Sequence, residues 1–160
     1  MKILVFSDSH GNTERMREAI DAHGKAVSLI IHLGDGKRDI EFVSAVYPEI
    51  PVISLNGNGE SALRDTRLIE EEGIRFMCMH GHTFGVKRSI DTAAEYAAEQ
   101  GADILLFGHT HVAEDYIVPL TDGRSVHVFN PGSIGHRPHS YGVINIPRRS
   151  VYVLSHAYSL

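Results

Sequence analysis

Five short apolar segments, each followed by glycine or by carboxylate, amide or imidazole side chains, constrain the fold more than any other feature of the sequence. They are the segments Ile3 to Phe6, Leu29 to Leu33, Val52 to Leu55, Ile74 to Met79 and Ile104 to Phe107. Short apolar runs bounded by turn residues are typical of buried β-strands. We therefore expect five strands whose ends carry polar, turn-forming residues.

Helical segments separate the first three of these strands. Asn12 or Thr13 can cap a helix that runs from Glu14 to about His23, and a second helix is expected near Asp39 to Tyr47. Strands that alternate with helices need crossover connections, which place the strands parallel to one another. This half of the chain is therefore predicted to form a largely parallel sheet.

The alternation of strands and helices does not continue in the second half of the chain. Thr66 to Glu70 and Ile74 to Met79 form a predicted hairpin, and Ser89 to Gln100 is a predicted helix. From Tyr116 onward, glycine and proline turns separate three or four further strands, which favours antiparallel pairing. The two halves suggest an α/β protein with two sheets packed face to face, helices outside, and a single domain over residues 1–160.

Composition narrows the class of protein. The chain has 160 residues, 42% of them hydrophobic and 22% charged, which suits one compact core. A net charge of −5 without a run of Lys or Arg argues against a nucleic-acid partner, because such binding needs a concentrated basic surface. The apolar stretch after Met1 is too short for a signal peptide or a membrane span, so cytoplasmic residence is expected. Cys78 lies in an apolar run and is expected in the core.

Metal-type ligands follow all five strands. Carboxylate, amide and imidazole side chains stand there at seven positions, which are Asp8, His10, Asp35, Asn58, His80, His109 and His111. Each short motif alone is also explained by turn or helix-cap chemistry, since Asp, Asn and Gly favour such positions. The regular recurrence at five strand ends, with paired histidines at two of them, favours a common site.

The ligand types restrict the metal. Oxygen and imidazole donors without thiolate suit Mn, Fe, Zn, Co or Ni. Seven ligands exceed one ordinary site, whereas a pair of ions about 3.5–4 Å apart, bridged by one carboxylate, explains the number. We expect two divalent metal ions, with manganese first among these metals.

The motifs resemble those of the calcineurin-like metallophosphoesterases, and within them the small single-domain YfcE-like branch. The motifs D-x-H, G-D, G-N, H-G-H and G-H-T-H occur in order, and the family's Asn-Pro-Gly-Ser loop is present as Asn130 to Ser133. The resemblance covers nearly the whole chain. It implies an αββα sandwich, that is, two mixed β-sheets flanked by helices.

The resemblance also implies how the ligands divide between the ions. One ion takes Asp8, His10, Asp35 and His111, and the other takes Asp35, Asn58, His80 and His109. Asp35 is then the bridging carboxylate. A hydroxide held between the ions attacks phosphorus in line, and the ions neutralise the charge that develops on the phosphoryl oxygens.

One departure from the larger relatives concerns proton donation. They carry a histidine directly after the motif asparagine, whereas this chain has Gly59, which puts general-acid assistance in doubt. His82 is a candidate proton donor or substrate contact, with a supporting or exposed imidazole as the alternative. Asn12 and Arg137 are candidate substrate contacts, since a guanidinium pairs well with phosphate. An exposed loop is the alternative for Arg137 and its neighbours His136 and His139.

The predicted function is hydrolysis of small phosphodiesters or phosphomonoesters. A protein-binding scaffold is a rival, because the small subunit of the retromer coat resembles this fold, but such a scaffold is expected to have lost ligands. A nuclease is a second rival, which usually carries extra domains and a basic surface. The physiological substrate, the native metal and a homo-oligomeric state are not determined by the sequence.

Overall fold

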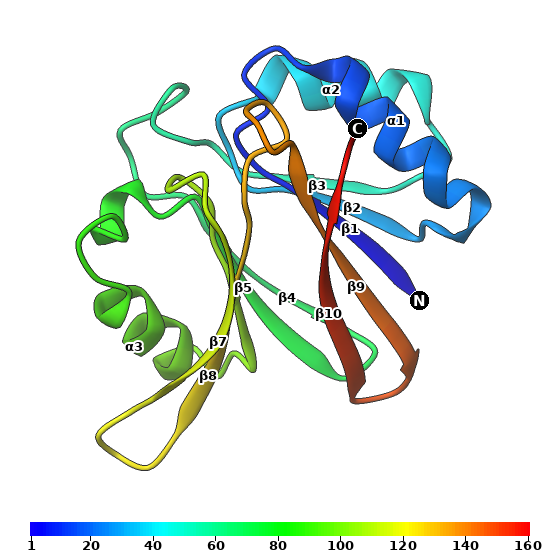
Figure 1. The fold of residues 1–160 in the computed structure, drawn as a ribbon. Helices are drawn as coiled ribbons and strands as arrows, with labels where there is room; N and C mark the ends of the chain where they lie inside the picture. Colours follow the sequence, from blue (N-terminus) through cyan, green and yellow to red (C-terminus); the bar gives the residue numbers. More distant parts are fainter.

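The computed structural model describes residues 1–160 and contains two five-stranded mixed sheets (Figure 1). The first sheet has the strand order β10-β9-β1-β2-β3. Its strands are β1 (Lys2–Phe6), β2 (Leu29–His32), β3 (Val52–Ser54), β9 (Ser140–Arg148) and β10 (Val151–Tyr158). Strands β1, β2 and β3 are parallel, and β9 pairs antiparallel with both β1 and β10.

Two helices lie on the outer face of this sheet (Figure 1). They are α1 (Thr13–His23) and α2 (Lys37–Val46), and a 3₁₀ turn (Gly24–Ala26) follows α1. Asn12 caps α1 as predicted, because its side-chain oxygen accepts a hydrogen bond from the Arg15 N–H. The apolar faces of both helices pack on Leu4, Phe6 and Ile30 of the sheet.

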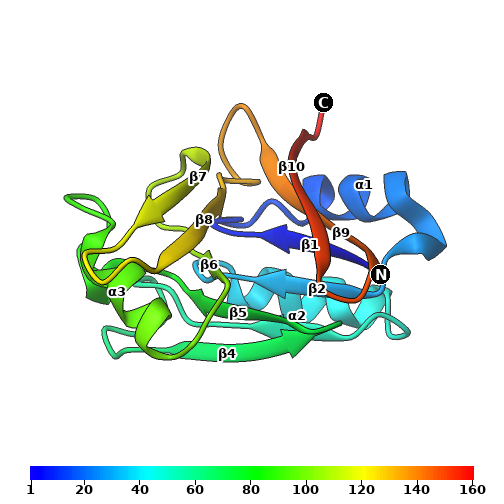
Figure 2. The same ribbon diagram turned by 90° about the horizontal axis from the view of Figure 1, so that it is seen from below.

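The second sheet has the strand order β4-β5-β6-β8-β7. Its strands are β4 (Thr66–Glu71), β5 (Ile74–Met79), β6 (Ile104–Leu106), β7 (Ala113–Pro119) and β8 (Ser125–Pro131). A 3₁₀ turn (His82–Phe84) and the helix α3 (Asp91–Glu99) follow β5, and α3 covers the outer face of this sheet (Figures 1 and 2). The layers are therefore helix, sheet, sheet and helix, which confirms the predicted αββα sandwich.

A core cluster lies between the two sheets. It combines side chains of both, among them Ile31 and Ile144 from the first sheet and Phe76, Leu106 and Phe129 from the second. Cys78 is fully buried in this cluster, and burial raises the pKa of its thiol to about 12. The predicted core role of this cysteine is confirmed.

Two details of the predicted topology were wrong. The sheets do not divide between the two halves of the chain, because the C-terminal strands β9 and β10 join the N-terminal strand β1. The last strands are also not purely antiparallel, since β8 pairs parallel with β6. Hydrophobic alternation identifies a strand but does not tell which neighbour it pairs with, and both errors come from this limit.

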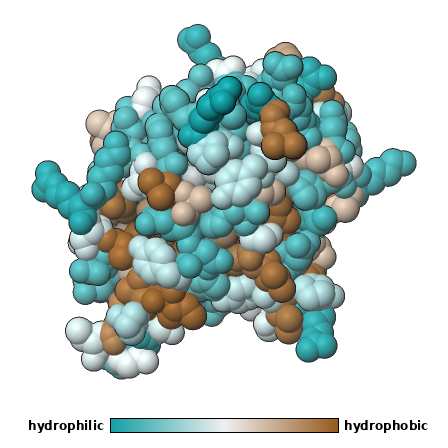
Figure 3. Space-filling model, in the orientation of Figure 1, coloured by the Kyte–Doolittle hydropathy of each residue, from teal (hydrophilic) through white to brown (hydrophobic).

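The surface carries both apolar and polar areas. Hydrophobic residues gather in the lower half of the face seen in Figure 3, and the upper part is mainly hydrophilic. Exposed apolar side chains occur on the edge strands, for example Ile117 of β7 and Val153 of β10. None of the helices combines the length and the apolar character that a membrane-spanning helix requires.

Candidate metal centre

The seven predicted ligands lie at the carboxyl ends of five strands, where loops from both sheets meet. Five of them have a left-handed backbone conformation, with φ between 44° and 68°, and these are Asp8, His10, Asp35, His109 and His111. Residues other than glycine adopt this backbone conformation rarely, and Asp, Asn and His tolerate it best. The strand ends are therefore turned sharply, and the structure brings the seven side chains into one neighbourhood.

Asp8 is the most buried of the carboxylates, with no exposed surface. Its Oδ2 accepts hydrogen bonds from the Ser7 hydroxyl and from the backbone N–H of His109, the latter at 3.0 Å. Its Oδ1 faces imidazole nitrogens instead. Two partners thus fix the orientation of the carboxylate and leave one oxygen for a ligand.

Three imidazoles surround this free oxygen. Asp8 Oδ1 lies 3.1 Å from His111 Nε2, 3.7 Å from His10 Nε2 and 3.8 Å from His80 Nε2. The His10 and His111 Nε2 atoms are themselves 3.4 Å apart. Donors bound to one ion at about 2.0–2.2 Å lie about 3–3.5 Å from one another, so the separations of 3.1 Å between Asp8 and His111 and 3.4 Å between His10 and His111 suit a shared cation.

Asp35 lies between the ligands expected for one ion, Asp8 and His10, and the ligand His80 expected for the other. Its Oδ2 is 3.5 Å from His80 Nε2, and one of its oxygens lies within 4.8 Å of donor atoms of Asp8 and His10. Its Oδ1 accepts a hydrogen bond from the Gly59 N–H at 2.8 Å. The neighbouring Gly57 is required here, because a Cβ at this position would lie 2.1 Å from Asp35 Oδ1.

His80 is fixed by a backbone carbonyl. Its Nδ1 lies 2.8 Å from the Leu33 carbonyl oxygen, which can only accept, so Nδ1 carries the proton. The Nε2 lone pair then points toward Asn58 Oδ1 at 3.0 Å. A ligating histidine in proteins typically has its other nitrogen held in this way.

His109 completes this second group, with its ring centroid 5.0 Å from that of His80. Partial burial, together with the nearby His80 and Lys87, lowers the pKa of His109 to about 4. The imidazole is therefore neutral at pH 7 and keeps a free lone pair, which is the form that binds a metal.

Glu60 is a site residue that the sequence analysis did not identify. Its carboxylate accepts hydrogen bonds from the backbone N–H groups of Asp35, Gly36, Lys37 and Gly57, at 2.7 to 3.0 Å. Burial opposes its ionisation, but the four N–H groups outweigh this and lower the pKa of Glu60. Glu60 thus joins the loop of Asp35 to the loop of Asn58. Its place two residues after the motif asparagine was the only signal in the sequence.

A buried chain of hydrogen bonds connects the loop after β1 with the loop after β2. The Gly34 N–H donates to His32 Nδ1 at 3.2 Å, so His32 Nε2 donates to the Ser9 hydroxyl at 3.0 Å. The Ser9 hydroxyl in turn donates to Asp39 Oδ2 at 2.6 Å. Complete burial lowers the pKa of His32 to about 4 and keeps it neutral, although Asp8, Asp39 and Glu60 partly counter this.

The structure places the candidate catalytic and substrate residues less uniformly. His82 lies beside His80, with ring centroids 5.4 Å apart, and its Nε2 donates to the Ser61 carbonyl at 2.9 Å. The amide oxygen of Asn12 is engaged in capping α1. Arg137 is exposed and lines a separate hollow with Arg15, and none of the seven ligands lines that hollow.

A cavity of about 640 Å³ opens directly over the ligands His10, Asp35 and Asn58. Lys37 and Arg38, at the start of α2, also line it and bring positive charge to its rim. This volume suits a small ligand that contacts the donor atoms.

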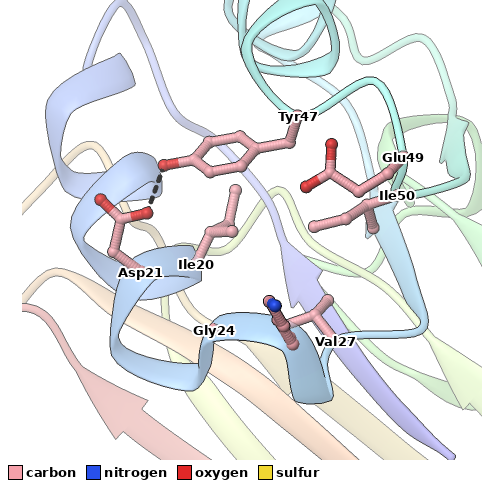
Figure 4. Close-up of a pocket in the computed structure, with 8 residues that line it drawn as sticks. Ile20, Asp21, Gly24, Val27, Tyr47, Glu49 and Ile50 are labelled. Carbon is pink, nitrogen blue, oxygen red and sulfur yellow. Dashed lines mark hydrogen bonds between the residues drawn. The ribbon is translucent and has the colours of Figure 1, made fainter.

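A second cavity, of about 480 Å³, lies between the ends of α1 and α2 (Figure 4). Tyr47 spans it and donates a hydrogen bond to Asp21 Oδ1 at 2.7 Å. Ile20, Val27 and Ile50 give it an apolar floor, and no histidine lines it. Asp21 and Glu49 also line it, so carboxylates occur at both cavities, but imidazole and carboxylate donors occur together only at the first.

Comparisons with known proteins agree with this geometry. The model of the calcineurin-like phosphoesterase superfamily domain matches residues 1–148. The probable metallophosphoesterase YsnB of Bacillus subtilis is 30% identical over 153 residues, which cover 91% of this chain and 85% of that protein.

Solved structures share the fold. A predicted phosphoesterase from Streptococcus pneumoniae has a TM-score of 0.77 at 24% identity, covering 99% of this chain and 89% of its own. An archaeal phosphodiesterase has a TM-score of 0.68 at 24% identity, with 98% and 100% covered. Vps29 from Entamoeba histolytica has a TM-score of 0.68 at 19% identity, with 99% of each chain covered. Family model, relative and fold agree, and the chain belongs to the calcineurin-like phosphoesterase superfamily.

Proposed function

We propose that this protein is a metal-dependent hydrolase of small phosphate esters that uses two divalent ions, with phosphodiesters or phosphomonoesters as substrates. The observation that carries this proposal is the convergence of seven oxygen and imidazole donors from five loops beneath one open cavity. Family membership supports the reaction class. Manganese is the expected metal, and Fe, Zn, Co and Ni suit the same donors.

The donor set fits a pair of cations. Without a cation, the lone pairs of His80 Nε2 and the carboxylate oxygens of Asp8 and Asp35 face one another at 3.5 to 3.8 Å. Such a cluster of acceptors is unfavourable unless positive charge lies between them. In this proposal, Asp8, His10, Asp35 and His111 hold one ion, and Asp35, Asn58, His80 and His109 hold the other.

The two ions, when bound, would activate the attacking water and neutralise charge on the phosphoryl oxygens. The chain's own residues supply the positioning. Ser7 and the His109 N–H hold Asp8, the Gly59 N–H holds Asp35, and the Leu33 carbonyl holds His80. Lys37 and Arg38 at the cavity rim attract an anionic ester toward these groups.

The size of the cavity and the small number of basic side chains on its rim favour a small substrate. Two basic side chains on its rim are enough to attract one phosphate group but form no extended basic track for a nucleic-acid backbone. The net charge of −5 acts in the same direction. A nuclease is therefore the less favoured hydrolase.

A protein-binding scaffold is the alternative from another class, and the structural likeness to Vps29 supports it. The ligand positions argue against it, because all seven carry donor side chains and several are held by dedicated hydrogen bonds. A scaffold needs no such set of oriented, mutually repelling donors.

Two measurements on Mn-reconstituted protein test the proposal. Elemental analysis should find two ions per chain, and a panel of phosphomonoesters and phosphodiesters should reveal turnover that chelator abolishes. A stoichiometry of one or none, with full activity retained in chelator, would exclude the dinuclear site. Two bound ions without turnover of any ester would favour the scaffold.

A further inference from the structure

A third imidazole stands beside His10 and His111. It belongs to His136, which lies in the exposed loop after the Asn-Pro-Gly-Ser segment. One nitrogen atom from each of these three histidines lies within 4.8 Å of the other two. His136 comes from a loop that contributes none of the seven ligands of the proposed centre, so its presence needs a separate explanation.

The ring positions of these histidines fit a common ion. Imidazoles that bind one metal at about 2.1 Å have ring centroids about 4.6–5.3 Å apart, between octahedral and tetrahedral geometry. The measured centroid distances are 5.3 Å for His10 and His111, 5.0 Å for His10 and His136, and 4.9 Å for His111 and His136. The His111 and His136 ring planes are inclined by only 19°, so these two rings can share an ion only where they lie side by side, close to one plane. His82, by contrast, is 6.2 Å from His109 in the other group.

Hydrogen bonding determines which nitrogen of His136 is free. The Ser133 hydroxyl donates its only hydrogen to the buried Asp8 carbonyl oxygen at 2.8 Å. The serine oxygen can then only accept from His136, whose Nδ1 lies 3.3 Å away and whose backbone N–H lies 3.1 Å away. Nδ1 therefore carries the proton, and the lone pair is on Nε2.

We propose that His136 is an additional metal ligand, binding through Nε2 the ion that Asp8, His10, Asp35 and His111 hold. This inference rests on the proposed function. Its hydrogen bond to Ser133 is the type of contact that fixes the tautomer of ligating histidines. An Nε2 without a proton can bind a metal but cannot donate a hydrogen bond to a phosphate oxygen. This disfavours a role of His136 as a phosphate contact.

An additional imidazole changes the metal preference of this position. Imidazole suits Zn, Fe and Ni, whereas carboxylate and water suit Mn. A site with three imidazoles and two carboxylates should therefore bind Zn or Co more tightly, relative to Mn, than the same site without His136. The neighbouring position, with two imidazoles, should not show this dependence.

The test compares His136→Ala and His136→Asn with the parent protein. In the Asn variant, the amide nitrogen stands close to the former Nδ1 and can still donate to Ser133, but no nitrogen remains at the Nε2 position. Apo-protein is titrated with Zn²⁺, Co²⁺ and Mn²⁺ in competition with a chelator. Both variants should bind one of the two ions at least about 10-fold more weakly. The loss should be larger for Zn²⁺ and Co²⁺ than for Mn²⁺, and the Co²⁺ absorption spectrum should change.

His139→Asn is the matched control. His139 lies three residues further along the same loop, and its Nδ1 makes a comparable contact to the Ile134 carbonyl at 3.0 Å. Its metal affinities should equal those of the parent.

Three results would overturn the inference. Unchanged affinities in both His136 variants would show that the imidazole does not bind metal. A loss confined to His136→Ala would show that only the hydrogen bond to Ser133 matters. Parent protein that binds fewer than two ions would overturn the proposed function as well, whereas the first two results leave that function intact.

Discussion

Non-glycine residues with positive φ occur at both ends of the sheets, but they serve different purposes there. At the hairpin end, Glu72 has φ 49° and Ser150 has φ 60°. Both are exposed, and the Ser150 N–H donates to the Glu72 carbonyl at 2.8 Å. Glu72 and Gly73 together form a two-residue loop with both φ values positive, as in a type I′ turn. The conformation here reverses the chain direction and matches the twist of the strands.

At the opposite end, the same conformation belongs to five candidate metal ligands, some of them deeply buried, and also to His139 in the loop after Ser133. Asp8 is 0% exposed and Asp35 is 9% exposed. Left-handed backbone costs about 1–3 kcal/mol for each such residue and persists only where the surroundings enforce it. Hydrogen bonds donated by Ser7 to Asp8 and by the Gly59 N–H to Asp35, and one that the Glu60 carboxylate accepts from the Asp35 N–H, do this here. The left-handed conformation thus reverses the chain at the hairpin end, whereas at the ligand end it orients donor atoms toward a shared point.

Of the substitutions at the ligand end, Asp35→Ala should have the largest effect on activity. Asp35 alone is expected to contact both ions, so its loss should reduce kcat/KM by about 10³-fold or more. His23→Ala, remote from the ligands, should behave like the parent. Steady-state kinetics with Mn-reconstituted proteins measure both. Similar losses in the two variants would show that the site is elsewhere.

Metal removal should affect the fold through the ligand end. A bound ion at about 100 times its Kd stabilises the native state by about 2.7 kcal/mol, which corresponds to about 5–10 °C in Tm for a chain of this size. Thermal unfolding with Mn²⁺ and with chelator measures this difference. The increase should largely disappear in Asp35→Ala. An equal increase in that variant would indicate binding outside the centre.

His32 gives the ligand end a pH dependence that the hairpin end lacks. Burial lowers its pKa to about 4, whereas the unfolded chain has a value near 6.5. The unfolded state therefore binds the proton first, and stability decreases as the pH falls from about 6.5 to about 4. The full contribution is about 3 kcal/mol.

Urea unfolding of metal-free protein at pH 7 and pH 4.5 measures this effect. His32→Gln removes the titrating group, so its stability should depend less on pH than that of the parent, whatever its stability at pH 7. Carboxylates contribute equally to both proteins, and the difference between them isolates His32. Identical pH dependences would show that His32 titrates normally.

The hairpin end should tolerate, and even gain from, a better turn residue. Asn followed by Gly is the preferred sequence of a type I′ turn, because Asn accepts positive φ more readily than Glu. Glu72→Asn should therefore raise the free energy of unfolding by about 0.5–1 kcal/mol. Activity should remain unchanged. A gain in stability accompanied by loss of activity would contradict the separation of the two ends.

The sequence was most informative about local features. The positions of the strands and helices were predicted correctly, because apolar runs and turn residues report directly on local structure. The candidate ligand residues were recognisable because they follow short apolar strands. The structure shows that Asp8 and His111, 103 positions apart, lie in contact.

Long-range pairing was not predictable in the same way. Nothing in β8 specifies β6 as its parallel neighbour, or in β9 specifies β1. Glu60 was missed for a related reason, since a carboxylate that accepts four backbone N–H groups looks like any exposed Glu in the sequence. Such roles depend on how loops from different strands meet, which periodicity does not encode.

Among substitutions at the ligand end, His82→Ala is expected to have the smallest effect on activity. His82 was a candidate proton donor because Gly59 leaves no imidazole beside Asn58. In the structure, its Nε2 donates to the Ser61 carbonyl, and its Nδ1 is buried without a hydrogen-bond partner.

General-acid assistance is commonly worth about 10²- to 10⁴-fold, and it matters most when the leaving group is a basic alkoxide. Without a donor, kcat/KM should depend steeply on leaving-group pKa, and aryl esters should react much faster than alkyl esters. His82→Ala should leave this slope nearly unchanged. A matched series of substituted phenyl and alkyl phosphodiesters measures it, provided that chemistry limits the rate. A shallow slope in the parent that steepens in His82→Ala would identify His82 as the proton donor, and a shallow slope in both would assign that role to another group.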